Sequence, residues 1–301
     1  MLTLPILTVE DQVEIIAPAS RCTEANLIAL QDILSTWQVK WIVNDHLFGP
    51  DLLCAHSDQH RFESLKNALL NPKNKAVICA RGGYGSMRLI PELAKITPSP
   101  TCKLFVGMSD ITALNIFLQQ QWQWPVIHGA LAPDKYSPES TAALKSLLWG
   151  AENRISFQGE AYNLAAQQDV TLESTVIGGN LSLLQTSIGT LWQVNGQKKI
   201  LFIEEVSERG YRIDRMLEHM RQAGIFDHVA AIVFGDFIGG EEPNGSSLVN
   251  SVLLRFAESC QFPVIKVHGI GHGYHNHPLP MGTKAQLSLG HHIELACFSR
   301  D

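Results

Sequence analysis

A serine on a short turn between two apolar stretches is the strongest chemical signal in the sequence. Residues 103–108 (KLFVGM) predict a short strand, and residues 110–120 predict a helix with a broad apolar face. Ser109 lies between them, so its hydroxyl would project from the sheet beside the positive end of the helix. This is the arrangement of a nucleophile elbow, although Ile111 replaces the second glycine of the usual G-x-S-x-G pattern. The alternative is that Ser109 only caps the helix.

A glycine-rich segment after another predicted strand could assist such a nucleophile. Three glycines fall within four positions of residues 81–86 (RGGYGS), which allows a tight turn and a close approach of backbone to ligand. The spacing matches neither a dinucleotide-binding fingerprint nor a Walker A loop. We expect its N–H groups to form half of an oxyanion hole, with the N–H after Ser109 as the other half. The alternative is a plain glycine turn before a helix.

The second half of the chain offers an acid and a base. Glu204 and Glu205 end a strong predicted strand (KKILFIEEV), and side-chain alternation lets only one of them face a given site. That carboxylate could orient a histidine, or both could be solvated at the strand end. A group of histidines follows within ten residues: His268, His272, His275 and His277. His272, between two glycines, is best placed as the base, with His275 and His277 as alternatives. A zinc site is a further alternative, although no H-E-x-x-H motif is present.

The elements that would position these groups alternate between strand and helix. Residues 13–149 predict strands and helices in turn, which is typical of a parallel sheet with its active groups at the carboxyl ends of the strands. We expect an α/β fold with an N-terminal parallel domain over residues 1–150. A linker would follow over residues 151–170, where periodicity is weak. A smaller C-terminal α/β or α+β domain would occupy residues 171–301 and end in a hairpin through Gly290.

Composition narrows the class of protein. The chain has 301 residues, 45% of them hydrophobic and 17% charged, as in an ordinary globular protein. A net charge of −6 without basic runs argues against nucleic-acid binding, and no apolar run is long enough to span a membrane. Six cysteines are scattered without a C-x-x-C pair, and no signal peptide is evident, so we expect a cytoplasmic protein with reduced thiols.

Taken together and in order, five motifs resemble the LD-carboxypeptidase family of serine peptidases, which includes murein tetrapeptide carboxypeptidases and microcin C immunity peptidases. They are ARGGYGSMRLIPEL, FVGMSDITALNIFL, GGNLSLL, FIEEVSERGYRIDRML and GHGYHNHPLPMG. The resemblance covers nearly the whole chain. It implies Ser109 as nucleophile, Glu204 as acid and His272 as base, with backbone N–H groups of Gly83 and Asp110 as oxyanion donors. It also implies substrate contacts by Tyr84 and Tyr211, no metal or other cofactor, and a homodimer.

The sequence departs from the family at two places. Met108 stands before the serine where an aromatic or other residue is usual, which leaves the elbow intact. Arg209-Gly210 replaces a proline-containing run, which weakens the expectation for Tyr211.

The resemblance implies hydrolysis of the amide between a diamino acid and a terminal D-alanine in murein tetrapeptides during peptidoglycan recycling. The alternatives are cleavage of peptidyl-nucleotide antibiotics, a zinc hydrolase, and a ligand-binding module without catalysis. In each catalytic case with Ser109, the site would form where the two halves of the chain meet.

Overall fold

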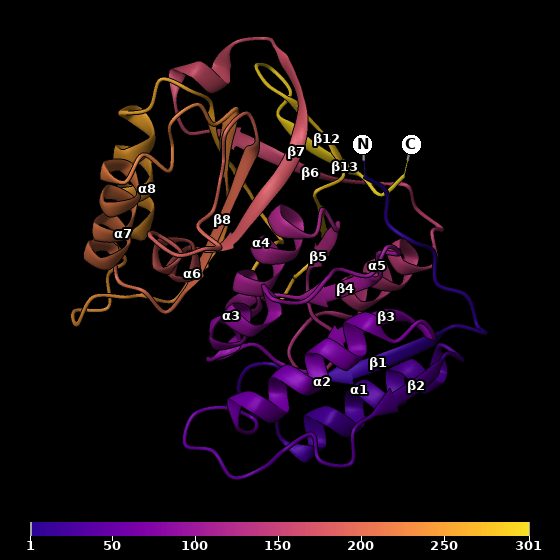
Figure 1. Cartoon of the computed structure of the whole chain (residues 1–301). Helices are drawn as coiled ribbons and strands as arrows, with labels where there is room; N and C mark the ends of the chain where they lie inside the picture. The colour runs from indigo at the N-terminus through magenta and orange to yellow at the C-terminus, as the bar shows by residue number, and fades with distance from the viewer. Residues whose placement is uncertain (1, 301) are drawn as a thin grey trace.

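Five strands of the first half of the chain and one later strand, β11 (Leu279–Met281), form a six-stranded sheet in the order β11-β5-β4-β3-β1-β2. The computed structural model describes residues 2–300 (Figure 1). Strands β1 to β5 are parallel to one another, and their buried apolar residues suit a sheet covered on both faces. The elements are β1 Gln12–Ile16, α1 Glu24–Thr36, β2 Lys40–Val43, α2 Asp58–Leu70, β3 Asn74–Cys79, η1 Ser86–Leu89, α3 Ile90–Leu93, β4 Leu104–Gly107, η2 Ser109–Ile111, α4 Thr112–Gln121, β5 Val126–His128 and α5 Pro138–Leu148.

Local sequence explains where several of these helices begin. The side chains of Thr23, Ser57 and Ser137 each accept a hydrogen bond from a backbone N–H in the first turn of α1, α2 and α5. The predicted parallel α/β arrangement is confirmed, and the carboxyl ends of β3, β4 and β5 meet at one edge of the sheet.

The second half closes into a barrel in the order β10-β6-β13-β12-β7-β8-β9. Strands β7 to β10 are parallel, and α7 and α8 pack side by side over them (Figure 1). The remaining strands pair antiparallel, including the predicted hairpin of β12 and β13. The elements are β6 Arg154–Ala161, η3 Leu164–Gln167, β7 Thr171–Asn180, α6 Leu181–Thr186, β8 Ile200–Val206, α7 Gly210–Gln222, β9 Ala231–Ile238, α8 Val249–Glu258, β10 Val264–Val267, β11 Leu279–Met281, β12 Lys284–Ser288 and β13 Glu294–Phe298.

Two segments depart from the organisation that the sequence predicts. Residues 151–170 predict a linker, but β6 occupies much of this range and pairs with β10 and β13. Its inward positions include Ile155 and Phe157 between exposed polar residues, and so short an alternation is a weak signal. The short strand β11 leaves the C-terminal half and pairs antiparallel with β5 in the other sheet.

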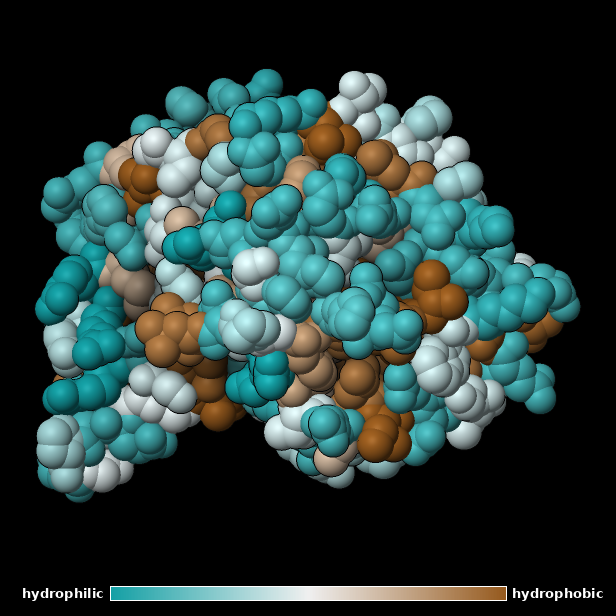
Figure 2. Space-filling model, turned by 60° about the horizontal axis from the view of Figure 1, so that its bottom comes forward, coloured by the Kyte–Doolittle hydropathy of each residue, from teal (hydrophilic) through white to brown (hydrophobic). Residues whose placement is uncertain are grey.

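The two ends of the chain lie together (Figure 1). Leu2 bridges to Thr283, and the N–H of Leu4 donates to the carbonyl of Ser299 at 2.8 Å. The face shown in Figure 2 is mostly hydrophilic, with apolar side chains in separate patches. Across residues 2–300, no helix has the length and hydrophobicity that a bilayer crossing requires.

Candidate active site

Ser109 lies on a strained turn at the carboxyl end of β4. Met108 is extended, whereas Ser109 has a φ of +61°, a conformation that non-glycine residues rarely adopt. Such strain clusters at functional sites. A Cβ on Gly107 would lie 2.4 Å from Ile111 Cγ2, so only glycine permits this tight turn. No side-chain hydrogen bond caps η2, so the alternative that Ser109 serves as the helix cap is wrong.

The glycine-rich segment after β3 lies directly against this serine. A Cβ added to Gly82 would lie 2.7 Å from the Cβ of Ser109, and Gly83 has a φ of +102°. The N–H of Ser86 donates to Asp110 Oδ2 at 2.8 Å, and Ser86 Oγ donates to the carbonyl of Asp110 at 2.6 Å. The glycine turn and the elbow are therefore joined by buried hydrogen bonds. Among residues 2–300, neither the N–H of Gly83 nor the N–H of Asp110 donates to a backbone carbonyl of a loop or of another element.

Glu204 and His272 form a buried pair. Glu204 Oε2 lies 2.6 Å from His272 Nδ1, and the two side chains are 0% and 7% exposed. Glu204 is near the end of β8, and His272 is in the loop after β10. This contact fixes the orientation of the imidazole and leaves Nε2 as the nitrogen available for proton transfer.

Glu205 faces the opposite side of β8, as strand alternation predicts. It accepts hydrogen bonds from Asn180 Nδ2 at 2.7 Å and from Ser182 N and Oγ at 2.8 and 2.7 Å. Burial raises the pKa of Glu205, and the nearby charge of Glu204 raises it further. The two adjacent glutamates thus have separate tasks, and Glu205 holds the start of α6 against β8.

The other histidines of the group go to different partners. His275 Nδ1 lies 3.2 Å from Ser137 Oγ, and the His275 and His277 rings stack with centroids 6.3 Å apart. His268 lies 3.7 and 3.8 Å from Glu160 and Asp236. In the part of the chain that the structure describes, no three histidine, cysteine or acidic side chains converge as metal ligands would.

Ser109 and His272 line one cavity of about 430 Å³ between the two halves of the chain. Gly82 and Gly83 also line this cavity, and Val206, at the end of β8, lines it from the barrel. Across residues 2–300, Ser109 Oγ is not hydrogen-bonded to His272. Ser109 and the histidine that Glu204 orients therefore face the same cavity.

The two tyrosines expected to contact substrate lie elsewhere. Tyr84 is exposed, and its N–H donates to Ser20 Oγ at 3.0 Å. Tyr211, at the start of α7, lines a separate depression, with the guanidinium of Arg209 5.1 Å from its ring centroid and that of Arg215 5.3 Å away. Neither tyrosine lines the cavity of Ser109, so their role in binding stays a prediction.

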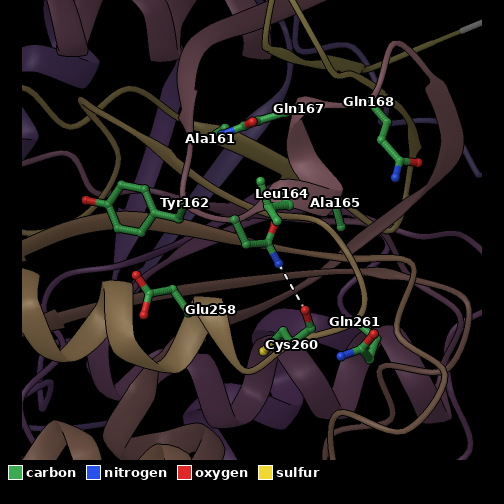
Figure 3. Close-up of a pocket in the computed structure, with 10 residues that line it drawn as sticks. Ala161, Tyr162, Leu164, Ala165, Gln167, Gln168, Glu258, Cys260 and Gln261 are labelled. Carbon is green, nitrogen blue, oxygen red and sulfur yellow. Dashed lines mark hydrogen bonds between the residues drawn. The ribbon is translucent and has the colours of Figure 1, made fainter.

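A larger hollow of about 600 Å³ lies on the barrel, between the β6–η3 segment and the end of α8 (Figure 3). Figure 3 shows Tyr162, Glu258 and Cys260 around it. Burial raises the pKa of the Cys260 thiol, so this cysteine is a poor nucleophile. The residues that line this hollow include no histidine, whereas the smaller cavity is lined by both Ser109 and His272.

Sequence reasoning missed three buried residues beside the catalytic groups. Asn276 Nδ2 donates to Met108 Sδ at 3.0 Å, and its Oδ1 accepts from the N–H of Gly271 at 3.4 Å. Tyr136 OH donates to the same sulfur at 3.4 Å. His128, at the end of β5, is fully buried, and burial lowers its pKa to about 4. The position of His128 at the carboxyl end of a parallel strand is the one signal that could have indicated it.

Comparison with known proteins identifies the family. Residues 13–129 match the LD-carboxypeptidase N-terminal domain, and residues 173–287 match the LD-carboxypeptidase C-terminal domain. A Rickettsia conorii protein described as a carboxypeptidase is 36% identical over 286 residues, covering 91% of this chain and 87% of that protein. The chain belongs to the LD-carboxypeptidase family.

Other members of the family share the fold over nearly the whole chain. The crystal structure of a muramoyltetrapeptide carboxypeptidase from Oxalobacter formigenes is 26% identical, with a TM-score of 0.81 over 95% of this chain and 98% of its own. The microcin C7 self-immunity protein of Escherichia coli is 26% identical over 77% of this chain and 76% of its own length. The family resemblance and fold class predicted from the sequence are confirmed.

Proposed function

We propose that this LD-carboxypeptidase family member is a serine carboxypeptidase with the triad Ser109, Glu204 and His272. Its substrate would be a murein tetrapeptide, cleaved at the amide between the L-centre of the diamino acid and the terminal D-alanine. The observation that carries the proposal is the buried 2.6 Å contact of Glu204 with His272, in a cavity shared with a strained elbow serine. The relative named a muramoyltetrapeptide carboxypeptidase supports the substrate.

The side chains support a two-step acyl transfer. His272 Nε2 takes the proton of Ser109 Oγ as the oxygen bonds to the scissile carbonyl carbon. The oxyanion accepts hydrogen bonds from the N–H groups of Gly83 and Asp110. His272 then gives the proton to the nitrogen of D-alanine, and the C–N bond breaks. Water, deprotonated by His272, releases the acyl group from Ser109.

Glu204 stabilises the imidazolium that forms in both steps, because its carboxylate is buried and in contact with Nδ1. The missing contact between Ser109 and His272 fits an unliganded enzyme, where catalytic hydrogen bonds are often long and shorten on substrate binding.

The test is hydrolysis of a purified murein tetrapeptide, followed by release of D-alanine. Ser109→Ala should lower kcat on the order of 10⁶-fold while circular dichroism and Tm stay unchanged. Prolonged chelation should leave the wild-type rate unchanged, since no residue in the mechanism needs a metal. An alanine variant with substantial activity would refute the nucleophile, and stoichiometric zinc whose removal abolishes activity would favour the zinc hydrolase.

A peptidyl-nucleotide assayed beside the tetrapeptide tests the second candidate function. The match to the microcin C7 self-immunity protein favours this alternative. A higher kcat/KM for the peptidyl-nucleotide would replace the first proposal and keep the triad. The proposed setting is peptidoglycan recycling in the cytoplasm, and the homodimer can be tested by sedimentation.

A further inference from the structure

Two cationic side chains line the cavity of Ser109. Arg81 follows β3, and Lys135 follows β5. Strand β4, which ends at Ser109, lies between β3 and β5 in the sheet. Because all three strands are parallel, their carboxyl ends meet at one edge, and Arg81 and Lys135 line the same cavity as Ser109 there.

Neither cation has a carboxylate partner within residues 2–300, although Arg61 and Arg88 of the same sheet unit both pair with Asp58. Arg81 donates one hydrogen bond, from Nη1 to the carbonyl of Arg21 at 3.2 Å. The ammonium of Lys135 lies 5.0 Å from the Tyr136 ring centroid. Both groups therefore keep hydrogen-bond donors free for a ligand.

The charges of the cavity favour an anion. Burial lowers the pKa of Lys135; the negative charges of Glu204 and Asp134 oppose this effect, and the positive charge of Arg81 adds to it. Arg81 and Lys135 line one cavity, so their like charges face a shared space. Asp134, the carboxylate in the cavity lining, accepts a hydrogen bond from Asn26. Two like charges facing one space are stabilised when an anion binds between them.

The substrate of a carboxypeptidase carries such an anion at a fixed position. In a terminal residue, the carboxylate oxygens lie within about 5 Å of the scissile carbonyl carbon, given standard bond lengths. The backbone at Arg81-Gly82 lies against Ser109, since a Cβ on Gly82 would be 2.7 Å from that of the serine. We propose that Arg81 and Lys135 form an anion subsite that binds the free α-carboxylate of the leaving amino acid.

This subsite rests on the proposed function and explains why such an enzyme would remove a terminal residue and leave internal amides intact. A peptide that continues beyond the scissile bond, or one with an amidated end, leaves both cations unpaired. Such a substrate loses the charge-assisted hydrogen bonds that a guanidinium and an ammonium make with a carboxylate.

The experiment compares the tetrapeptide with the same peptide amidated at its terminal D-alanine. For the wild type, amidation should raise KM about 10- to 100-fold, the range expected for lost hydrogen bonds between charged groups. Lys135→Met and Arg81→Gln should each raise KM for the free acid by a similar factor and change KM for the amide little. Lys135→Arg should restore most of the loss. Both positions are exposed, so folding should be retained.

Two controls separate the possible failures. Lys95→Met removes an exposed lysine paired with Glu92 outside the cavity, and it should behave as wild type. In the Ser109→Ala background, calorimetry should show tighter binding of the free acid than of the amide, and Lys135→Met should reduce that difference. Equal turnover of acid and amide by the wild type would overturn the subsite alone. No turnover of either peptide would overturn the proposed function and the subsite with it.

Discussion

Removal of the Asn276 side chain should impair catalysis more than folding. Its amide bridges the residue before Ser109 and the residue before His272, since it contacts Met108 Sδ at 3.0 Å and the N–H of Gly271 at 3.4 Å. Asn276 is 2% exposed, so no water can easily replace these contacts in Asn276→Ala. Asn276 is thus a positioning residue, which acts on Ser109 and His272 through their neighbours.

The magnitude follows from the groups that would be left without partners. Asn276→Ala leaves the buried N–H of Gly271 without its acceptor, at a cost of about 1–3 kcal/mol. If that energy is lost from the alignment of Ser109 with His272, kcat/KM should fall about 5- to 150-fold. The fall should lie mainly in kcat, because neither Met108 Sδ nor the Gly271 N–H binds substrate in the proposed mechanism.

Asn163 provides a matched control. It is also a buried asparagine, and its amide donates to the carbonyls of Ala257, Cys260 and Phe262 on the far side of the barrel. Asn163→Ala should lower Tm at least as much as Asn276→Ala and leave kcat of the folded enzyme unchanged. Equal kcat losses in the two variants, or a normal kcat in Asn276→Ala with a lowered Tm, would refute the positioning role.

Three further predictions concern neighbouring groups. Glu204→Gln should lower kcat about 10⁴-fold with little change in fold, by analogy with triad aspartates replaced by amides. The raised pKa of Glu205 means that the native state binds its proton more tightly than the unfolded state, so stability should fall as pH rises from about 4.5 through that raised pKa. Urea titrations from pH 4 to 7 should show this slope in wild type and a smaller one in Glu205→Gln. Gly82→Ala should nearly abolish activity by displacing Ser109, whereas Gly129→Ala, whose added Cβ meets nothing closer than 3.5 Å, should not.

Local patterns predict much of this fold because they record which face of each element is buried. The apolar spacing of residues 58–70 predicts a helix with the bounds that α2 has. Alternation in β8 likewise predicts that Glu204 and Glu205 face opposite sides. The elbow is predictable for the same reason, since a strand, a serine and a helix adjoin in sequence.

Local sequence patterns cannot predict which strands and loops that are far apart in the sequence come into contact. Closure of the barrel depends on β6 meeting β10 and β13, and its apolar residues are too few to distinguish a strand from a linker. Three-residue β11 has no periodicity of its own and is a strand only because β5 leaves an edge to pair with. The contact of Asn276 with Met108 joins two loops that are adjacent only in the folded chain.

The crossing of β11 into the first sheet restricts how the two halves can move. Residues 268–278 run from β10 in the barrel to β11 in the other sheet, and they carry His272. A second tie joins the halves where the N–H of Asn180 donates to Thr112 Oγ1 at 3.0 Å. A hinge that opened the cleft would have to displace the segment that carries His272 and break the second tie, so we expect the two halves to move little relative to one another. At about 430 Å³, the cavity is at the small end of ligand pockets, about 300–1,000 Å³. We therefore expect the cavity to accept a single peptide end more readily than a branched or cross-linked polymer.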